Sequence, residues 1–364
     1  MKTWITIIRW LVGILFIFSG LIKANDPLGL SYKMQEFFEV WDMHFMYPYT
    51  LTLSLLMNIF EVLAGVALII GWQMKWFSAL LLLLIIFFTF LTGYALFSGK
   101  IKTCGCFGDC LPLTPAQSFM KDLLLWALIV LIRFSLKNIN PIFSTRVSLV
   151  ILVLAVVGTA GAQAYVLQNA PFVDCLPYKQ GNNLLEKMKT PPGAIPDSFA
   201  IEFTYSKNGK SLSFDADHFP EDFDSTYQYV DRKDRLVKKG NGLQAAIVDF
   251  TLQTPAGTDT TAALLNSNSR YLLVLALHFN EVGEWRKNYE AVRNLAKEKG
   301  IPVWLVTADA TNAHQLFPNE NILICDATVI KTAARVQPTF FLMQGATIQQ
   351  KCAVTCTDRL IKAF

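Results

Sequence analysis

Five apolar stretches, each close to the length that a helix needs to cross a lipid bilayer, dominate the first half of the chain. A transmembrane helix requires about 20 consecutive, mostly apolar residues. Here the stretches lie at residues 4–22, 50–72, 76–98, 118–136 and 146–167. From residue 171 onward the chain instead carries most of its Asp, Glu, Lys and Asn side chains. The sequence therefore predicts five spans in a lipid bilayer, followed by a water-soluble half.

Charges in the short loops predict how these spans are oriented. Lys2, Lys75, Lys137 and Arg146 fall on one side of the predicted membrane, with no acidic residue among them. Because cytoplasmic loops are enriched in Lys and Arg, we expect a cytoplasmic N-terminus and, after five spans, a periplasmic second half. The expected location is the inner (cytoplasmic) membrane. No clean small-x-small cleavage site follows the first span, so we expect that span to be retained.

The same patterns divide the chain into four predicted segments. Residues 1–145 form a four-span helical bundle, and residues 146–170 form a fifth transmembrane helix. Residues 171–240 form a linker with a small β-rich part, since Asn208-Gly209 between alternating apolar and polar residues is a strong hairpin signal. Residues 241–364 alternate strands and helices. The expected strands are 271–279, 301–308, 339–343 and 347–352, and the expected helices are 284–299, 326–335 and 357–364.

Several classes of function are disfavoured by the sequence. The net charge of +4 is small and dispersed, and no Lys/Arg-rich run indicates nucleic-acid binding. The four histidines are isolated in sequence, without metal-ligand spacing, so no metal site is predicted.

The sharpest local feature is a cysteine cluster between the third and fourth spans, Cys104-Gly105-Cys106-Phe107-Gly108-Asp109-Cys110. Cysteines separated by one residue form only a strained ring, and strained, exposed disulfides are the labile ones. We therefore interpret Cys104 and Cys106 as a redox pair, with Cys110 close enough to resolve or shuttle. A structural clip remains an alternative. A zinc or iron–sulfur site is disfavoured, because no histidine lies nearby and a second ligand pair is missing.

Two charges are predicted inside the membrane, Arg9 in the first span and Glu61 in the second. A charge there is costly unless it is paired or reaches water. We expect Arg9 and Glu61 to form a buried pair that moves protons or holds a quinone head group. The alternatives are a pair that fixes helix register, or an Arg9 that extends to the inner interface. Ser19 and Lys23 share one helix face near the outer surface, where the lysine either anchors the interface or favours a nearby thiolate.

The other cysteines have separate expectations. Cys352 and Cys356 lie four residues apart, which fits either a local disulfide or a functional pair. Cys175 follows the fifth span closely enough to reach the cysteine cluster, and Cys325 lies beside an apolar run as a core thiol. Seven cysteines is an odd number, so at least one is free or pairs between chains.

The first four spans resemble the DoxX/MauE group of small four-span membrane proteins. The resemblance covers about residues 5–136 and rests on Arg9-x3-Gly13-x2-Phe16-x2-Ser19-Gly20-x2-Lys23, on Glu61-x3-Gly65 and on the Cys-Gly-Cys-Phe-Gly-Asp loop. It implies quinone-linked oxidation or disulfide formation in secreted proteins. The bundle is also similar to the vitamin K epoxide reductase architecture, which uses Cys-x2-Cys where this chain has Cys-x-Cys.

Residues 247–364 resemble the thioredoxin-like fold in its TlpA/peroxiredoxin form. The resemblance rests on Asp249-Phe250-x-Leu252-x4-Gly257 and on Val336-Gln337-Pro338-Thr339, and it implies a cis-proline before the strand that follows. At the position of that family's Cys-x2-Cys, this chain reads His278-Phe279-Asn280-Glu281. We therefore expect this domain to bind a peptide or partner protein, or to shape the site above the membrane, and not to exchange thiols from the usual position.

The leading hypothesis is a membrane thiol–disulfide oxidoreductase, or an accessory to one. Cys104 and Cys106 would exchange with periplasmic protein thiols, Cys110 or Cys175 would act as a relay, and a quinone near Glu61 and Arg9 would take the electrons. The alternative is a membrane-anchored scaffold whose cysteines are staples and whose C-terminal domain binds a partner of an envelope or secretion assembly.

Overall fold

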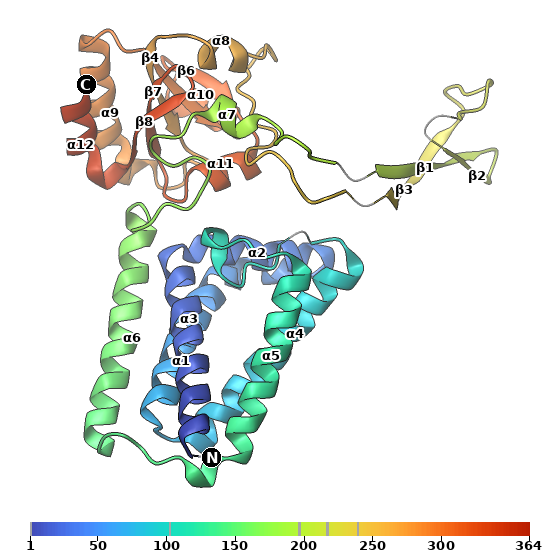
Figure 1. Cartoon of the computed structure of the whole chain (residues 1–364). Helices are drawn as coiled ribbons and strands as arrows, with labels where there is room; N and C mark the ends of the chain where they lie inside the picture. The colour runs from blue at the N-terminus through green and yellow to red at the C-terminus, as the bar shows by residue number, and fades with distance from the viewer. Residues whose placement is uncertain (1, 102, 196–197, 216–217, 239) are drawn as a thin grey trace. The chain divides into compact units, whose positions relative to one another are not determined.

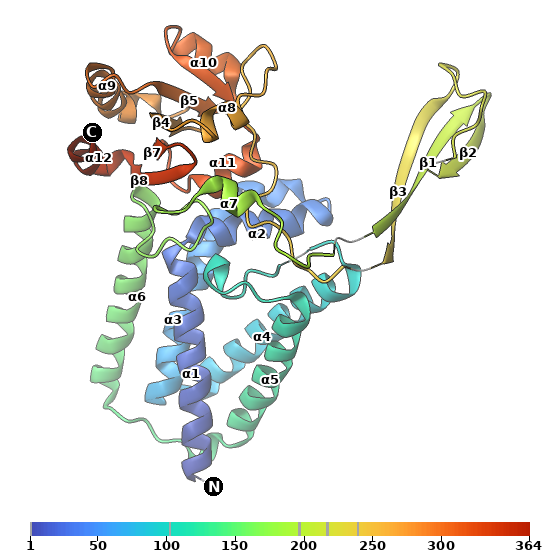
Figure 2. The ribbon, with the colours of Figure 1, turned by 45° about the horizontal axis from the view of Figure 1, so that its top comes forward.

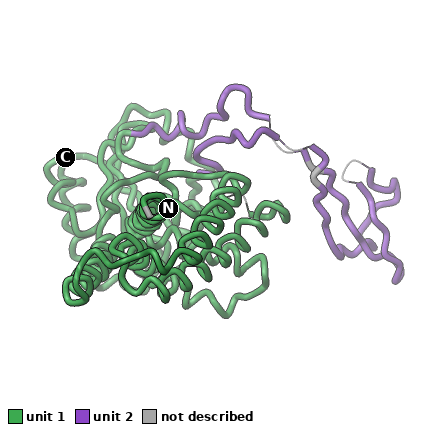
Figure 3. Tube along the Cα trace, turned by 60° about the horizontal axis from the view of Figure 1, so that its bottom comes forward, with its two compact units in different colours: residues 1–181, 251–364 green, residues 182–250 purple. Residues whose placement is uncertain are grey.

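The computed structural model describes residues 2–101, 103–195, 198–215, 218–238 and 240–364. The chain divides into two compact units, Met1–Gly181 with Thr251–Phe364, and Asn182–Phe250 (Figure 3). Parts of the expected 171–240 linker, at residues 196–197, 216–217 and 239, lie outside the described residues.

Five helices of the first unit are long and apolar enough to cross a membrane, which confirms the five predicted spans and a membrane protein. They are α1 (Lys2–Asn25), α3 (Thr50–Ile70), α4 (Met74–Ser98), α5 (Pro115–Phe134) and α6 (Thr145–Gln168). Figure 1 shows a further helix, α2 (Pro27–Val40), lying across the end of the bundle. The short 3₁₀ helices η1 (His44–Tyr49), η2 (Gly108–Cys110) and η3 (Leu136–Asn138) complete this region.

Local sequence signals explain where these helices begin. Thr114 caps α5 in a capping box with Gln117, and Pro115 occupies the first turn, as the sequence predicts. Asp26 caps α2 by accepting a hydrogen bond of 2.9 Å from the backbone N–H of Gly29. The two caps set where α5 and α2 begin.

Glycines allow α1 and α3 to pack with their backbones close together. A Cβ atom at Gly65 would lie 2.7 Å from the carbonyl oxygen of Gly13, and one at Gly13 would lie 2.9 Å from that of Gly65. Small residues at such positions are typical of membrane helix pairs, where packing is the main attraction between helices. Around this contact lies an apolar core that includes Val12, Leu68 and Ile129.

The C-terminal region of the first unit is a five-stranded sheet of order β6-β5-β4-β7-β8 with helices. Strands β4, β5 and β6 run parallel, while β7 is antiparallel to β4 and β8 is antiparallel to β7. The strands are β4 (Arg270–Leu275), β5 (Val303–Thr307), β6 (Asn321–Ile324), β7 (Thr339–Gln344) and β8 (Thr347–Ala353), and the helices are α8 (Thr261–Leu265), α9 (Val282–Glu298), α10 (Ala310–Leu316), α11 (Ala327–Ala333), η4 (Val354–Cys356) and α12 (Thr357–Ala363).

Most of the elements predicted for this region are present within a few residues of their expected bounds. Helix α9 buries Trp285, Tyr289, Val292 and Ala296, a spacing that places one apolar face on the sheet. The short elements α8, α10 and β6 were missed. The peptide bond before Pro338 is cis, as the resemblance implies.

The second unit contains α7 (Leu184–Met188) and a three-stranded antiparallel sheet of order β2-β1-β3. Its strands are β1 (Ser198–Lys207), β2 (Lys210–Asp215) and β3 (Gln228–Lys238). Asn208 and Gly209 both have positive φ angles, 52° and 74°, as a two-residue hairpin turn requires. The predicted hairpin is therefore confirmed.

The α1–α3 contact leads to a stability prediction. Substituting Gly65→Ala forces the two helices apart, because the new Cβ meets the backbone of α1, and we expect a loss of about 1–3 kcal/mol in the free energy of unfolding. Gly161→Ala in α6 is the matched control, since a Cβ there has nothing within 4 Å. Thermal unfolding in detergent micelles measures both variants, and equal stabilities would contradict the close contact.

Candidate functional site

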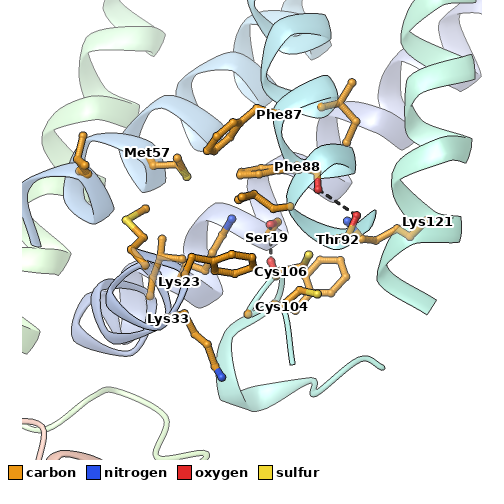
Figure 4. Close-up of a pocket in the computed structure, with 18 of the residues that line it drawn as sticks. Ser19, Lys23, Lys33, Met57, Phe87, Phe88, Thr92, Cys104, Cys106 and Lys121 are labelled. Carbon is orange, nitrogen blue, oxygen red and sulfur yellow. Dashed lines mark hydrogen bonds between the residues drawn. The ribbon is translucent and has the colours of Figure 1, made fainter. Parts of the chain in front are cut away.

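A cavity of about 190 Å³ opens among α1 to α5 at the end of the bundle that carries the cysteine cluster (Figure 4). We call residues 104–110 the cysteine loop. The cavity walls are largely aromatic and aliphatic, and the aromatic side chains include Phe16, Phe37, Phe38, Trp41, Phe87 and Phe88. Cys104, Gly105 and Cys106 of the cysteine loop form part of the lining. The polar residues of the lining are few, and three of them are lysines, Lys23, Lys33 and Lys121.

Cys104 and Cys106 are free thiols that both face this cavity. Gly105 between them has a φ of 69°, a left-handed conformation that glycine adopts without strain. A Cβ at Gly105 would also lie 3.2 Å from Cγ of Lys33 on α2. The glycine thus lets the loop turn both neighbouring cysteines toward one space.

The buried carboxylate Glu61 pairs with Lys23, and not with Arg9. Lys23 Nζ donates to Glu61 Oε1, and the two side chains are 2% and 0% exposed. The predicted Arg9–Glu61 pair is therefore wrong. Lys23 lies on the same helix as Arg9, 14 residues further along the chain. At 1.5 Å per residue, it is about 21 Å nearer than Arg9 to the cysteine-loop end of the bundle. The interpretation of Lys23 as an interfacial anchor is also wrong, because its ammonium is buried in this ion pair.

Ser19 connects this ion pair to the cysteine loop. Its Oγ lies 2.9 Å from Glu61 Oε2 and 3.0 Å from the carbonyl oxygen of Cys106. A hydroxyl has one proton, so it donates to one of these oxygens at a time. The position of the cysteine loop is thus linked by one hydroxyl to a buried ion pair on α1 and α3.

Arg9 lies at the other end of α1 and is not among the residues that line the cavity. Its side chain is buried against the turn after α3, where Nη1 would be 2.7 Å from a Cβ at Gly71. In the part of the chain that the structure describes, Arg9 forms no ion pair, and its Nε has no hydrogen-bond partner. Its expected quinone contact is therefore not supported by position.

A second ion pair, with a buried carboxylate on α5, was not anticipated. Asp122 is fully buried, accepts from Thr92 Oγ1 at 3.0 Å and pairs with Lys121 Nζ. The ammonium of Lys121 also lies 5.4 Å from the ring centroid of Phe107, the residue after Cys106. The signal was present in the sequence as a carboxylate inside an apolar span, the same pattern that drew attention to Glu61.

Two disulfides are formed, Cys110–Cys175 and Cys352–Cys356. In the first, Cys175 meets the cysteine loop, and in the second, two cysteines four residues apart are joined locally. Side chains alternate along a strand: Lys351 of β8 donates to Asp174, whereas Cys352 packs in the core with Tyr289 and Phe340. The C-terminal disulfide therefore faces the core of its own region. Cys325 is a buried free thiol, as expected.

The surroundings of the two cavity thiols oppose their ionisation. Burial, followed by the neighbouring Cys106, raises the pKa of Cys104 to about 12. Burial also raises the pKa of Cys106, although the nearby ammonium of Lys121 acts in the opposite direction. Both cysteines are therefore thiols at neutral pH, and a reaction at either one requires a group that accepts its proton.

No group of three or more His, Cys, Asp or Glu side chains suited to a metal ion occurs among the described residues.

Comparison with known proteins identifies two regions of the chain. Residues 1–135 match the family model described as Methylamine utilisation protein MauE, so this part is a MauE-like membrane region. Residues 199–239 match a domain of unknown function, DUF8463. No curated protein matches the chain, and no solved structure does. The resemblance of residues 247–364 to thioredoxin-like proteins has no matching family model and stays a prediction.

Removing one member of the Lys23–Glu61 pair leaves an uncompensated buried charge. We expect Lys23→Met or Glu61→Gln alone to lower the free energy of unfolding by about 3–5 kcal/mol, and the double variant to recover most of that loss. Lys33→Met is the control, since its 2.5 Å contact with Glu36 is partly exposed and should contribute at most about 1 kcal/mol. Additive single losses in the double variant would show that the two side chains do not interact.

The raised pKa of Cys104 predicts a pH profile. In a Cys106→Ser/Cys325→Ser variant with its disulfides intact, the rate of Cys104 alkylation should rise about tenfold per pH unit from pH 8 to pH 10, because the thiolate fraction is still growing. Denatured protein is the control, and its rate should level off above the ordinary thiol pKa of 9.0. A plateau near pH 9 in the folded protein would show that Cys104 is not held as a thiol.

Proposed function

We propose that this protein is a membrane thiol–disulfide oxidoreductase, or an accessory to one, that moves electrons between protein thiols and a quinone held in the cavity. The observation that carries the proposal is the position of Cys104 and Cys106. Both are free, and both line a largely aromatic cavity in the bundle. The MauE description concerns methylamine utilisation, and a redox role in that setting agrees with the proposal.

The cavity suits a flat ring with polar oxygens. An apolar cavity of about 150 Å³ holds a benzene ring, and this cavity is about 190 Å³. Its aromatic walls favour stacking, and the ammonium groups of Lys23 and Lys121 supply hydrogen-bond donors for carbonyl oxygens. Glu61 forms an ion pair with Lys23, and Asp122 forms one with Lys121. In this proposal these two lysines contact the quinone, in place of the Arg9–Glu61 pair expected from the sequence.

The redox step uses the two thiols as a unit. When Cys104 and Cys106 form a disulfide, two electrons and two protons leave the sulfur atoms, and a bound quinone supplies the acceptor for both. The protons start on thiols whose pKa values are raised, so nearby carboxylates must assist their transfer. Ser19 links Glu61 to the loop that carries both thiols, and Lys121 links Asp122 to the same cavity.

The Cys110–Cys175 disulfide and the C-terminal region are suited to thiol–disulfide exchange with proteins on one side of the membrane. In this proposal the cysteine loop faces the periplasm, the N-terminus is cytoplasmic, and the Cys110–Cys175 disulfide relays electrons by exchange with the Cys104/Cys106 pair. The C-terminal region, thioredoxin-like in this proposal, binds the partner protein. It contributes no thiol at the end of β4, where His278 and Phe279 stand.

A specific observation favours the second candidate, a non-catalytic scaffold. Cys352–Cys356 packs into the core of the C-terminal region, and Cys110–Cys175 joins two segments distant in sequence. Both positions are typical of structural disulfides. In this reading Cys104 and Cys106 are free thiols without a redox role.

Trapping the cysteines in membranes with quinone present and quinone depleted separates the two candidates. An oxidoreductase predicts that Cys104 and Cys106 are mainly disulfide-bonded with quinone and mainly thiols without it. Cys325→Ser, which removes the buried core thiol, should leave this change intact. In addition, Cys104→Ser or Cys106→Ser alone should accumulate a mixed disulfide between the remaining thiol and Cys110 or Cys175, because the missing thiol can no longer complete the exchange. An identical redox state in both membranes would leave the scaffold as the function.

A further inference from the structure

Two elements close the cavity at its cysteine-loop end, helix α2 and the cysteine loop itself. Residues of α2 and its C-cap line the cavity at helical spacing, Leu30, Lys33, Met34, Phe37, Phe38 and Trp41. This spacing turns one face of α2 toward the cavity. Figure 1 and Figure 2 show α2 between the bundle and α11 of the C-terminal region. We call α2 and the cysteine loop together the roof of the cavity.

One side chain of the C-terminal region binds both parts of the roof. Arg335, two residues after α11, donates from Nε to Asp26 at 2.8 Å and from Nη2 to Asp109 at 2.7 Å. Asp26 is the N-cap of α2, and Asp109 belongs to the cysteine loop next to Cys110. The guanidinium also lies 5.5 Å from the ring centroid of Tyr32 on α2. A single buried cation thus joins two separate roof elements.

Burial of Arg335 strengthens these ion pairs, because water screens them little. Its side chain is 7% exposed, compared with 16% for Asp26 and 45% for Asp109. Burial acts to lower the pKa of Arg335, but the carboxylates of Asp26 and Asp109 outweigh it and raise the pKa. Charge-assisted bonds to a planar guanidinium are geometrically specific, and a lysine cannot reproduce the two directed contacts.

Two further contacts hold the cysteine loop near the C-terminal region. The Cys110–Cys175 disulfide ties the cysteine loop to the segment after α6. Asp174, the neighbour of Cys175, binds Lys351 of β8 at 2.7 Å. Each cysteine of this disulfide is therefore preceded by an aspartate that is held by a basic residue of the C-terminal region.

We propose that Arg335 is a positioning residue that holds α2 and the cysteine loop closed over the cavity, so that docking of the C-terminal region sets how readily Cys104 and Cys106 are reached from outside. This goes beyond the proposed redox function, because it concerns access and does not require a quinone or a redox reaction. The partner of the roof is a region of this same chain, and the contact consists of one arginine against two carboxylates.

The test is the alkylation rate of Cys104 and Cys106 by a water-soluble maleimide, measured by mass spectrometry on the full-length protein in nanodiscs at one pH. Arg335→Gln should raise the rate about tenfold, because losing a buried charge-assisted bond shifts a local opening equilibrium by that order. Arg335→Lys should fall between wild type and Arg335→Gln. Arg359→Gln is the control, since Arg359 is exposed on α12, and it should leave the rate unchanged.

A second variant covers the case in which Arg335→Gln does not accumulate. Asp109→Ala removes only the cysteine-loop contact and leaves the Asp26 contact in place, so it should give a smaller rise in the same rate. Unchanged rates in the variant that folds would overturn the proposal. The alkylation rate tests only the role of Arg335. The quinone-dependent redox state tests only the proposed function, so either proposal can fail without the other.

Discussion

The structure of the site depends on how the apolar bundle accommodates charge. Glu61 is fully buried in α3, and such a carboxylate is tolerated only when a cation and hydrogen bonds compensate it. Lys23 provides the cation, and Ser19 provides a hydroxyl that is also within reach of the Cys106 carbonyl. One compensated charge therefore joins α1 to α3, and its Ser19 partner lies within hydrogen-bond distance of the cysteine loop. The Lys121–Asp122 pair repeats this solution on α5.

Much of the architecture could be predicted from the sequence because it follows from local patterns. Hydropathy over about 20 residues gives the five spans, the Thr114–Gln117 capping box gives the start of α5, and Asn208-Gly209 gives the hairpin of the second unit. The cysteine loop was also evident from its spacing, and its first two cysteines, Cys104 and Cys106, both line one cavity. These features need no knowledge of how distant segments pack.

The parts that could not be predicted depend on partners far apart in sequence. Arg9 and Lys23 lie on one helix. Which of them contacts Glu61 depends on how far α3 is shifted along α1, and the sequence does not give that shift. Arg335 lies 309 residues from Asp26 and 226 from Asp109, so no periodicity connects them. The sequence itself shows that the position of the thioredoxin-like Cys-x2-Cys, after β4, carries no cysteine. What the sequence did not show is that the C-terminal region reaches the roof through Arg335.

The central claim is that the cavity beside Cys104 and Cys106 binds a quinone. Photo-crosslinking with a light-activated quinone analogue in nanodiscs, followed by peptide mapping, tests it most directly. The account predicts labels on cavity residues such as Met34, Met57 and Phe88, suppressed by excess unlabelled quinone. Labels confined to exposed apolar positions of the bundle, such as Phe90 and Leu124, without competition, would contradict it.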